Sequence, residues 1–438
     1  MIPAEVAPAE SPTPLNGSPA VVTFTLRTTI AAIDATTQSD HTGMRFQRLA
    51  MSDDATLHRH AGPMPPASGE VAASSLTAVQ MLRCPRCRSV TVLETLECAG
   101  CELAVGFHPP TLTMREATRE GVGIDDRVWF PCSNRDWRCN WLVAEDAGAG
   151  RCLSCRLNRQ RPEASDTIAL EKLADASRVM RRLLVQLAEL GLPVDPHYER
   201  EGGLAFDLLS SYSGQGRVTI GHANGVVTID LVETLDDYRE ALRIRLREPY
   251  RTMLGHFRHE VGHYYQWILV EQTDWIDECR ELFGDERASY SEALDRHYRD
   301  GAPEGWEASY ISEYATMHPW EDFAESFAHY LHITDSLTTA AAGGLVLQAD
   351  RLDGLVDADI APRRSYQEAS TSEMLADWQW LSLLLNRVNH AMGRSDLYPF
   401  TITEAVRTKL DFVHRVVQAT ADRNAGRPVL ACLPLARS

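Results

Sequence analysis

Two histidines and a glutamate in the segment 255–265 (GHFRHEVGHYY) have the types and spacing of a metal-dependent hydrolytic site. In a helix, residues four positions apart lie on one face, so His259 and His263 can direct ring nitrogens at a single metal ion. Glu260 would stand beside that metal, where its carboxylate could act as a general base toward water. Because an amphipathic helix can carry two surface histidines by chance, this HExxH pattern needs a third ligand elsewhere in the chain.

Glu321, 58 positions after His263, is the candidate for that third ligand. Pro319 suits the first position of a helix, so Glu321 falls in the first turn of a second predicted helix, with Glu325 one turn later on the same face. Two histidines and Glu321 would leave one coordination position for water, as catalytic zinc requires, and Glu325 could hydrogen-bond the far nitrogen of a ligand histidine. The alternative is that these acidic residues only favour the dipole at the start of a helix.

Eight of the ten cysteines follow a pattern that predicts two structural zinc sites. Four thiolates complete a tetrahedral coordination shell and leave no position for water. Disulfides would be the alternative in a secreted protein, but the first 15 residues lack the basic and apolar regions of a secretory signal, so we expect a cytoplasmic protein. The first set is Cys84, Cys87, Cys98 and Cys101, and the second is Cys132, Cys139, Cys152 and Cys155.

Composition limits the class of partner. The 438 residues have a formal net charge of −18, and residues 81–165 hold twelve arginines, no lysine and eleven acidic residues. Nucleic-acid binding is therefore disfavoured, although arginines interleaved with Trp137 and Trp141 would permit it. No apolar run is long enough for a membrane span.

The two cysteines outside these sets, Cys279 and Cys432, are expected to pack as small apolar groups.

The elements that must position these residues fall into strands followed by helices, which indicates an α+β fold. Helical periodicity begins at Ser165. An Ala223-Asn-Gly225 segment predicts a tight turn between two strands. The expected strands are 89–93, 127–130, 204–209, 217–220 and 226–231, and the later helices are 251–271, 319–333, 373–392 and 402–420.

The segment Glu321-Asp-Phe-Ala-Glu325 after HExxH resembles the second helix of gluzincin-type zincin metallopeptidases. More narrowly, the region from Cys84 to Val417 resembles a bacterial family of zinc-binding metallopeptidases with an N-terminal zinc ribbon. The matching segments are 139–143 (CNWLV), 152–158 (CLSCRLN), 248–265 (EPYRTMLGHFRHEVGHYY), 283–286 (FGDE), 318–332 (HPWEDFAESFAHYLH) and 396–400 (DLYPF).

This resemblance implies a zinc-dependent peptidase that acts on a peptide or protein substrate. Zinc would bind to His259, His263 and Glu321, with Glu260 as general base and Glu325 behind a ligand histidine. With the two cysteine sites, one catalytic and two structural Zn²⁺ ions are expected. The expected parts are a disordered or low-complexity tail (1–80), a double four-cysteine zinc-ribbon module (81–165), a zincin-like domain (166–425) and a C-terminal tail (426–438).

Two finer expectations concern the substrate. Tyr310, Tyr314 and His318 precede the Glu321 helix and are candidates to stabilise an oxyanion. The strand at 226–231 is expected to be the sheet edge that pairs with an extended peptide. The alternative function is a non-catalytic, zinc-stabilised interaction protein or zinc-ribbon adaptor, although a structural metal site has no need of Glu260. The oligomeric state stays open.

Overall fold

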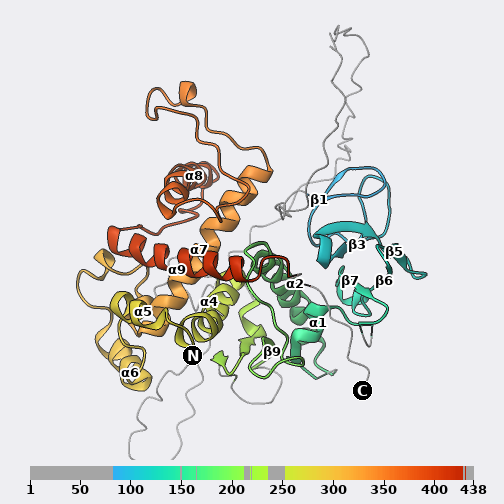
Figure 1. Ribbon diagram of the computed structural model, residues 1–438, viewed down its shortest axis with the longest axis horizontal. Helices are drawn as coiled ribbons and strands as arrows, with labels where there is room; N and C mark the ends of the chain where they lie inside the picture. Colours follow the sequence, from blue (N-terminus) through green and yellow to red (C-terminus); the bar gives the residue numbers. More distant parts are fainter. Residues whose placement is uncertain are drawn as a thin grey trace, which may run out of the picture. The chain divides into compact units, whose positions relative to one another are not determined.

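Small sheets lie before residue 231, separated into two groups by the long helix α2 (Thr167–Glu189), and the other long helices follow, which confirms the predicted α+β class (Figure 1). The computed structural model describes residues 82–147, 150–163, 165–211, 218, 220–234, 252–427 and 430. The predicted N-terminal tail lies outside the described residues, as do Cys432 and most of the predicted C-terminal tail.

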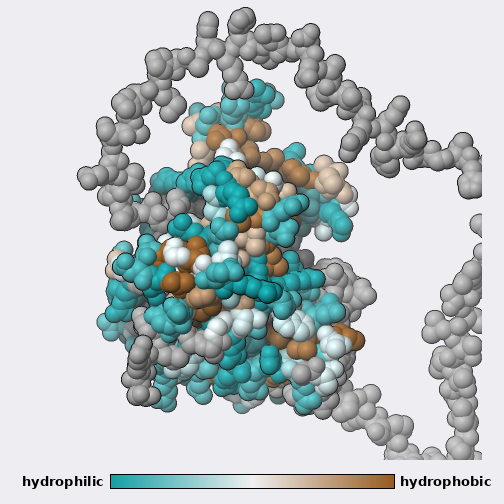
Figure 2. Space-filling model, turned by 90° about the vertical axis from the view of Figure 1, so that its right-hand side faces the viewer, coloured by the Kyte–Doolittle hydropathy of each residue, from teal (hydrophilic) through white to brown (hydrophobic). Residues whose placement is uncertain are grey.

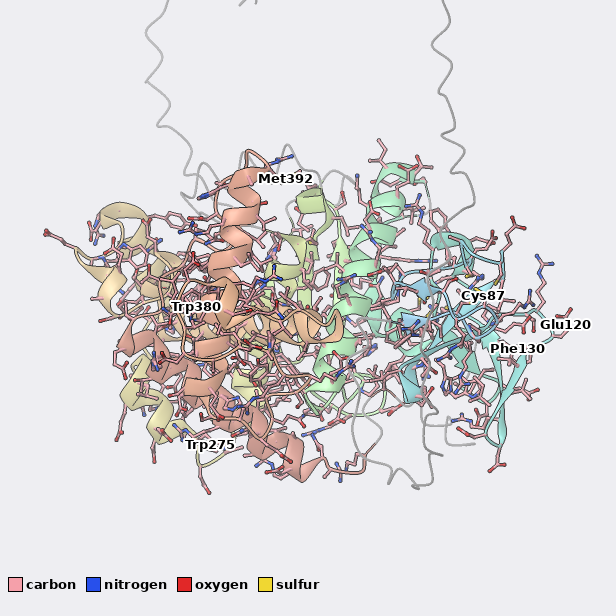
Figure 3. All side chains as sticks on the ribbon, turned by 90° about the horizontal axis from the view of Figure 1, so that it is seen from above. Cys87, Glu120, Phe130, Trp275, Trp380 and Met392 are labelled. Atoms are coloured by element: carbon pink, nitrogen blue, oxygen red, sulfur yellow. The ribbon has the colours of Figure 1, made fainter. Side chains whose placement is uncertain are left out.

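The cysteine-rich module consists of three small antiparallel sheets, with orders β1-β2, β3-β4 and β5-β6-β7. Its core contains Phe107 and Trp141, which are fully buried with ring centroids 5.6 Å apart, whereas Trp137 is 50% exposed. Figure 3 labels Cys87, Glu120 and Phe130 on this module, and Trp275, Trp380 and Met392 on the helical part. The strands are β1 (Leu82–Arg83), β2 (Val90–Thr91), β3 (Val105–His108), β4 (Thr113–Glu116), β5 (Val122–Ile124), β6 (Arg127–Pro131) and β7 (Leu142–Ala144).

A four-stranded mixed sheet with the order β10-β11-β9-β8 combines one strand from the end of the module, β8, with three strands that come later in the chain. The predicted turn is present, since Asn224 (φ 49°) and Gly225 (φ 84°) adopt the left-handed conformations that a tight hairpin requires. The prediction that 226–231 forms the sheet edge is wrong, because β11 pairs with β10 on one side and with β9, in parallel, on the other. Of the described strands, β10 lies at this edge. The strands are β8 (Asn158–Gln160), β9 (Ala205–Leu209), β10 (Gly221–Ala223) and β11 (Val226–Asp230).

The helices begin close to the predicted positions, and several have clear start signals. Thr252, Ser370 and Thr403 accept hydrogen bonds from the first turns of α4, α8 and α9, as N-cap side chains do. Helix α7 continues nine residues beyond the predicted end, and the predicted helix at 251–271 changes to a π-helix after Tyr265. The helices are α1 (Leu153–Leu157), α2 (Thr167–Glu189), α4 (Met253–Tyr265), the π-helix η5 (Gln266–Glu271), α5 (Ile276–Phe283), α6 (Tyr290–Asp300), α7 (Pro319–Ala342), α8 (Thr371–Ala391) and α9 (Glu404–Arg423).

Helix α4 lies between the mixed sheet and α7. On the sheet side, the Phe257 ring packs against Phe206 of β9, with centroids 5.8 Å apart. On the other side, Gly262 allows α4 to approach α7 closely, since a Cβ built at Gly262 would lie 3.0 Å from the Ala324 Cα. This close approach brings the HExxH segment next to the first turns of α7.

A buried polar network holds α2, α4 and α7 in register. The Arg258 guanidinium donates to Gln186 Oε1 at 2.8 and 3.0 Å and to Asp335 Oδ2 at 2.6 Å. Gln186 in turn donates to the Leu331 carbonyl oxygen at 2.7 Å. Charged hydrogen bonds in a buried setting are strong and directional, so this network fixes the relative rotation of the three helices.

Figure 2 shows apolar residues on one face as separate patches among hydrophilic ones. Large exposed apolar side chains include Trp137, Leu355 and Met392. Within the described ranges, no helix combines the length and the apolar composition that crossing a bilayer requires.

Candidate metal centre

Helices α4 and α7 bring three predicted metal ligands together. His259 Nε2 lies 3.0 Å from Glu321 Oε2 and 3.2 Å from His263 Nε2, and His263 Nε2 lies 3.4 Å from the same carboxylate oxygen. Two ring nitrogens and a carboxylate oxygen so close together repel each other unless a cation or a proton lies between them. Adjacent ligands of tetrahedral zinc at bond lengths of about 2.0–2.1 Å are about 3.3 Å apart, so these residues fit zinc.

Glu325 occupies the position expected of a residue behind a ligand. Its Oε1 lies 2.7 Å from His259 Nδ1, and its Oε2 accepts a hydrogen bond from Ser312 Oγ at 2.7 Å. A proton on Nδ1 that is donated to Glu325 leaves Nε2 of His259 with a free lone pair for a metal. Burial alone would lower the pKa of His259, but Glu321 and Glu325 outweigh it and raise that pKa to about 10. The site therefore has an excess of negative charge that favours a bound cation.

Glu260 is fully buried, and only one of its oxygens is hydrogen-bonded within the described residues. Oε1 lies 3.2 Å from His256 Nε2, one helical turn earlier, whereas Oε2 has no partner there. Burial would raise the pKa of Glu260, but His256 and His259 lower it to about 2. The carboxylate is therefore ionised at neutral pH and has one oxygen available to accept a proton.

Tyr290 is a site residue that the sequence did not single out. Its hydroxyl, at the start of α6, donates to Glu321 Oε1 at 2.8 Å, whereas the two histidines lie close to Oε2 of the same carboxylate. Such a contact orients a ligand carboxylate. Tyr290 is 31 residues before Glu321 in the chain, and no local pattern links the two.

The three candidate oxyanion donors have different surroundings. Both ring nitrogens of His318 are occupied, since Nδ1 accepts from the Trp320 N–H at 3.2 Å and Nε2 lies 3.0 Å from the Ala288 carbonyl oxygen. The Tyr310 ring packs 4.2 Å from the Lys409 ammonium. Tyr314 lies beside the site.

The Tyr314 ring centroid is 5.9 Å from that of His259, and its buried hydroxyl makes no close hydrogen bond among the described residues, although the Tyr290 hydroxyl lies near enough to interact with it. Burial, with Glu321 and Tyr290 nearby, raises the pKa of Tyr314 well above its usual value. The hydroxyl therefore keeps its proton and remains a donor at neutral pH.

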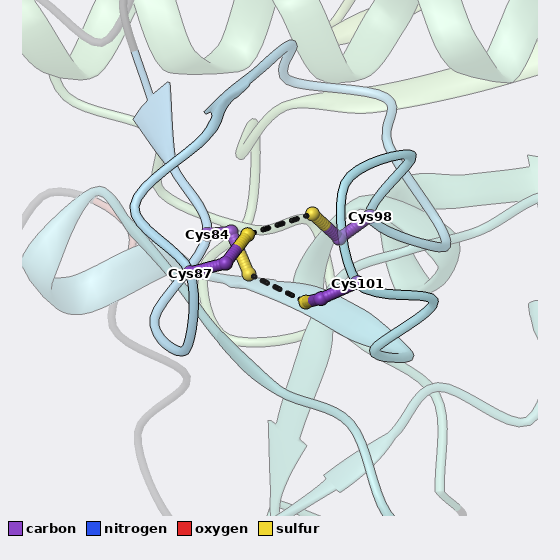
Figure 4. A group of neighbouring side chains, drawn as sticks. All are labelled: Cys84, Cys87, Cys98 and Cys101. Carbon is purple, nitrogen blue, oxygen red and sulfur yellow. Dashed lines mark hydrogen bonds between the residues drawn. The ribbon is translucent and has the colours of Figure 1, made fainter.

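The cysteines form the two predicted sets. In the first, two knuckle turns face each other, with Cys84 Sγ 3.7 Å from Cys101 Sγ and Cys87 Sγ 3.5 Å from Cys98 Sγ (Figure 4). Tetrahedral zinc at about 2.3 Å from each sulfur places the ligands about 3.8 Å apart, so the set fits zinc. Ser89 Oγ, 3.2 Å from Cys87 Sγ, lowers the pKa of that thiol to about 6 and favours the thiolate.

The second cysteine set is more deeply buried. Cys132 Sγ lies 3.7 Å from Cys155 Sγ, and Cys139 Sγ lies 3.6 Å from Cys152 Sγ. These separations again match a tetrahedral sulfur site. The remaining described cysteine, Cys279, is buried and packs with apolar neighbours, as predicted.

A pocket of about 180 Å³ adjoins the ligands His263 and Glu321. Its walls come from the β10 edge and the following turn, from the π-helix η5, and from the first turns of α6 and α7. Besides the two ligands, the lining includes His222, Asn224, Gln266, Trp267, Glu271 and Trp320. The candidate metal centre is thus next to a concave surface at the edge of the sheet.

Comparison with known proteins gives matches for both parts of the chain. A family model described as "Putative zinc-binding metallo-peptidase" matches residues 169–416, and a zinc-ribbon domain model matches residues 81–166. Proteins of Mycobacterium tuberculosis and Mycobacterium bovis, named as uncharacterized proteins, are 44% identical over 341 residues, which is 77% of this chain and 95% of each relative. No solved structure matches the chain. The predicted resemblance is confirmed, and the chain belongs to this family of zinc-binding metallopeptidases, with a zinc-ribbon domain preceding the family domain.

Proposed function

We propose that this chain is a zinc-dependent peptidase that hydrolyses peptide bonds. Two neighbouring features support the proposal. Three ligand atoms lie at the separations of a tetrahedral zinc site, and next to them the buried carboxylate of Glu260 has one oxygen without a hydrogen bond among the described residues. A metal site that only stabilises a fold needs no ionised carboxylate with a free oxygen beside it. A general base at a zinc site needs that arrangement.

The roles follow from the contacts. Zinc bound to His259, His263 and Glu321 would polarise a substrate carbonyl and lower the pKa of water toward about 7. His256 holds Oε1 of Glu260, so Oε2 takes the proton of the attacking water and passes it to the leaving amine.

The Tyr314 hydroxyl is the donor for the oxyanion, because it is the candidate beside His259 and makes no close hydrogen bond among the described residues. The substrate backbone pairs with the edge of β10, beside the pocket that adjoins the ligands. We assign the two cysteine sites a structural role, and the absence of disulfides among these eight cysteines suits a reducing compartment such as the cytoplasm.

Metal analysis combined with peptide hydrolysis tests this proposal. We expect about three zinc ions per wild-type chain and about two in His263→Ala and Glu321→Ala, because the cysteine sites are separate. Glu260→Gln should keep all three ions and lose hydrolysis of internally quenched peptides, since the amide cannot accept the proton. The proposal fails if Glu260→Gln remains active, or if both ligand variants bind as much zinc as the wild type.

A further inference from the structure

We propose that the pocket beside the metal centre recognises a cationic group of the substrate, an ammonium or a guanidinium, through Glu271, Trp267 and Trp320. This proposal rests on the proposed peptidase function and adds a substrate class to it. The cation could belong to a lysine or arginine side chain next to the cleaved bond, or to a free amino terminus.

The carboxylate of Glu271 lies in the pocket wall, where it can accept hydrogen bonds. Its Oε1 accepts a hydrogen bond from Trp320 Nε1 at 3.0 Å. Its other oxygen has no hydrogen bond or ion pair within the described residues. Burial raises the pKa of Glu271, and Arg280, whose charge lowers it, is itself paired with Glu286 at 2.6 Å.

The rest of the pocket also favours a cation. Trp267 and Trp320 are half-buried and line it, and the faces of tryptophan rings attract positive charge. Gln266 is buried, and its side-chain oxygen has no hydrogen-bond partner among the described residues. None of the described lining residues is a lysine or an arginine. Away from the metal ligands, an anionic group would therefore meet no positively charged side chain among the described lining residues.

The π-helix η5 explains why these side chains meet at the pocket. It follows directly after the HExxH helix α4, and its backbone hydrogen bonds run between residues five positions apart. This spacing places Gln266 and Glu271 on one face, whereas a regular α-helix would turn them well apart. The pocket is also smaller than the roughly 300–1,000 Å³ of drug-sized sites, so it suits one side chain or one terminus.

Cleavage of matched peptides tests the proposal. A series of internally quenched peptides would carry lysine, arginine, norleucine or glutamate at each position near the cleaved bond, with free or acetylated amino termini. We expect the wild type to prefer the cationic peptides by about tenfold or more, as for a hydrogen bond to a charged group. Loss of cleavage on acetylation would identify the amino terminus as the cation, whereas insensitivity to acetylation would identify the side chain.

Glu271→Gln is the decisive variant, because glutamine keeps an oxygen for Trp320 Nε1 and removes only the charge. It should reduce the ratio of kcat/KM for lysine over norleucine peptides at least tenfold, and Glu271→Lys should shift the preference toward glutamate peptides. Glu281→Gln, on the exposed surface of α5, is the matched control and should retain the wild-type ratio. Zinc content and Tm verify that each variant is folded.

A binding measurement separates this proposal from the peptidase proposal. In the Glu260→Gln background, a labelled lysine peptide should bind at least tenfold more tightly than its norleucine analogue, and Glu271→Gln should abolish the difference. Binding of this kind without any cleavage by the wild type would refute the peptidase function and leave cation recognition standing. Cleavage without a cationic preference, or a preference unchanged by Glu271→Gln, would overturn the proposal made here.

Discussion

The hydroxyl of Tyr314 is a buried polar group that makes no close hydrogen bond with the described residues, and the neighbouring Tyr290 hydroxyl already donates to Glu321. An unsatisfied group of this kind costs about 1–3 kcal/mol of stability. A donor that is used only when negative charge develops on a substrate would account for that cost, since it adds stabilisation in the transition state without binding the ground state.

We predict that Tyr314→Phe lowers kcat by about 10²–10³-fold, the effect of removing one oxyanion donor, while zinc content stays at the wild-type level. Tyr310→Phe is the matched control, since phenylalanine keeps the ring that packs against Lys409, and its kcat should be unchanged. Steady-state kinetics on one peptide substrate measures both. Equal kcat values for Tyr314→Phe and the wild type would show that another group stabilises the oxyanion.

At this scale, the sequence was informative where residues are linked by helical spacing. The pairs His259 with His263 and Glu321 with Glu325 could be predicted because four-residue steps share a helix face. Tyr290 could not be predicted, because its contact with Glu321 joins two elements through the tertiary fold. His318 was a candidate by position alone, and the structure shows that both of its ring nitrogens have other partners.

Among the elements, the contact between α4 and α7 decides whether the ligands can meet. A Cβ at Gly262 would lie 3.0 and 3.1 Å from the Cα and carbonyl oxygen of Ala324, which are backbone atoms inside a helix. Helix propensity by itself predicts that alanine would stabilise a helix interior by about 1 kcal/mol relative to glycine. The two effects have opposite signs at Gly262.

We predict that Gly262→Ala destabilises the protein by about 1–3 kcal/mol, as for other overpacked cores. It should also weaken zinc binding at the site of His259, His263 and Glu321. Gly343→Ala is the control, because its Cβ would meet only ordinary contacts at 3.5 Å, and its stability should not fall. Urea unfolding and zinc competition with a chelator measure the two quantities. An increase in stability for Gly262→Ala would show that the two helices can separate without loss.

The elements themselves were predicted unevenly. Long helices with N-cap residues and apolar periodicity could be located to within a few residues. The π-helix η5 could not, because its change of hydrogen-bond pattern has no sequence signature. The edge position of β10 could not be predicted either, because the composition of a strand does not specify its neighbours. The parallel pairing of β11 with the earlier strand β9 leaves β10 at the edge.

Across the whole molecule, buried neutral histidines make stability depend on pH. Burial, with a contribution from Arg115, lowers the pKa of His108 in the ribbon module to about 4. Burial also lowers the pKa of His414 in α9, whose Nε2 lies 2.8 Å from the Ala369 carbonyl oxygen and whose Nδ1 lies 3.1 Å from Tyr330 Oη. At pH values below the usual histidine pKa of about 6.5, the unfolded chain binds protons that the folded chain does not.

We therefore predict that the free energy of unfolding is highest above pH 7 and falls as the pH decreases through about 6.5 toward 4. His414→Gln should show a shallower fall, because the glutamine takes up no proton on unfolding. Urea unfolding of both proteins at pH 7.5, 6.5 and 5.5 measures the two slopes, and the comparison cancels any zinc release common to both. Identical slopes would show that His414 is protonated equally in the folded and unfolded states.

The ribbon and the family domain are also linked by direct contacts. Arg181 of α2 donates to the Arg138 carbonyl oxygen at 3.0 Å, and Arg182 pairs with Glu94 at 2.8 Å. Buried apolar side chains of both parts belong to one continuous core. The start of helical periodicity at Ser165 predicted a change of architecture there, and the structure adds that the buried core continues across that position.

The edge position of β10 restricts the proteins on which such a site could act. A segment that pairs along β10 must be fully extended, with its backbone N–H and C=O groups free of other partners. Residues in a stable helix or sheet of a target meet neither condition until that region opens. The rate of cleavage would then follow the free energy of local unfolding in the target, so frayed termini, long loops and damaged proteins would be cut first, and intact domains would be spared.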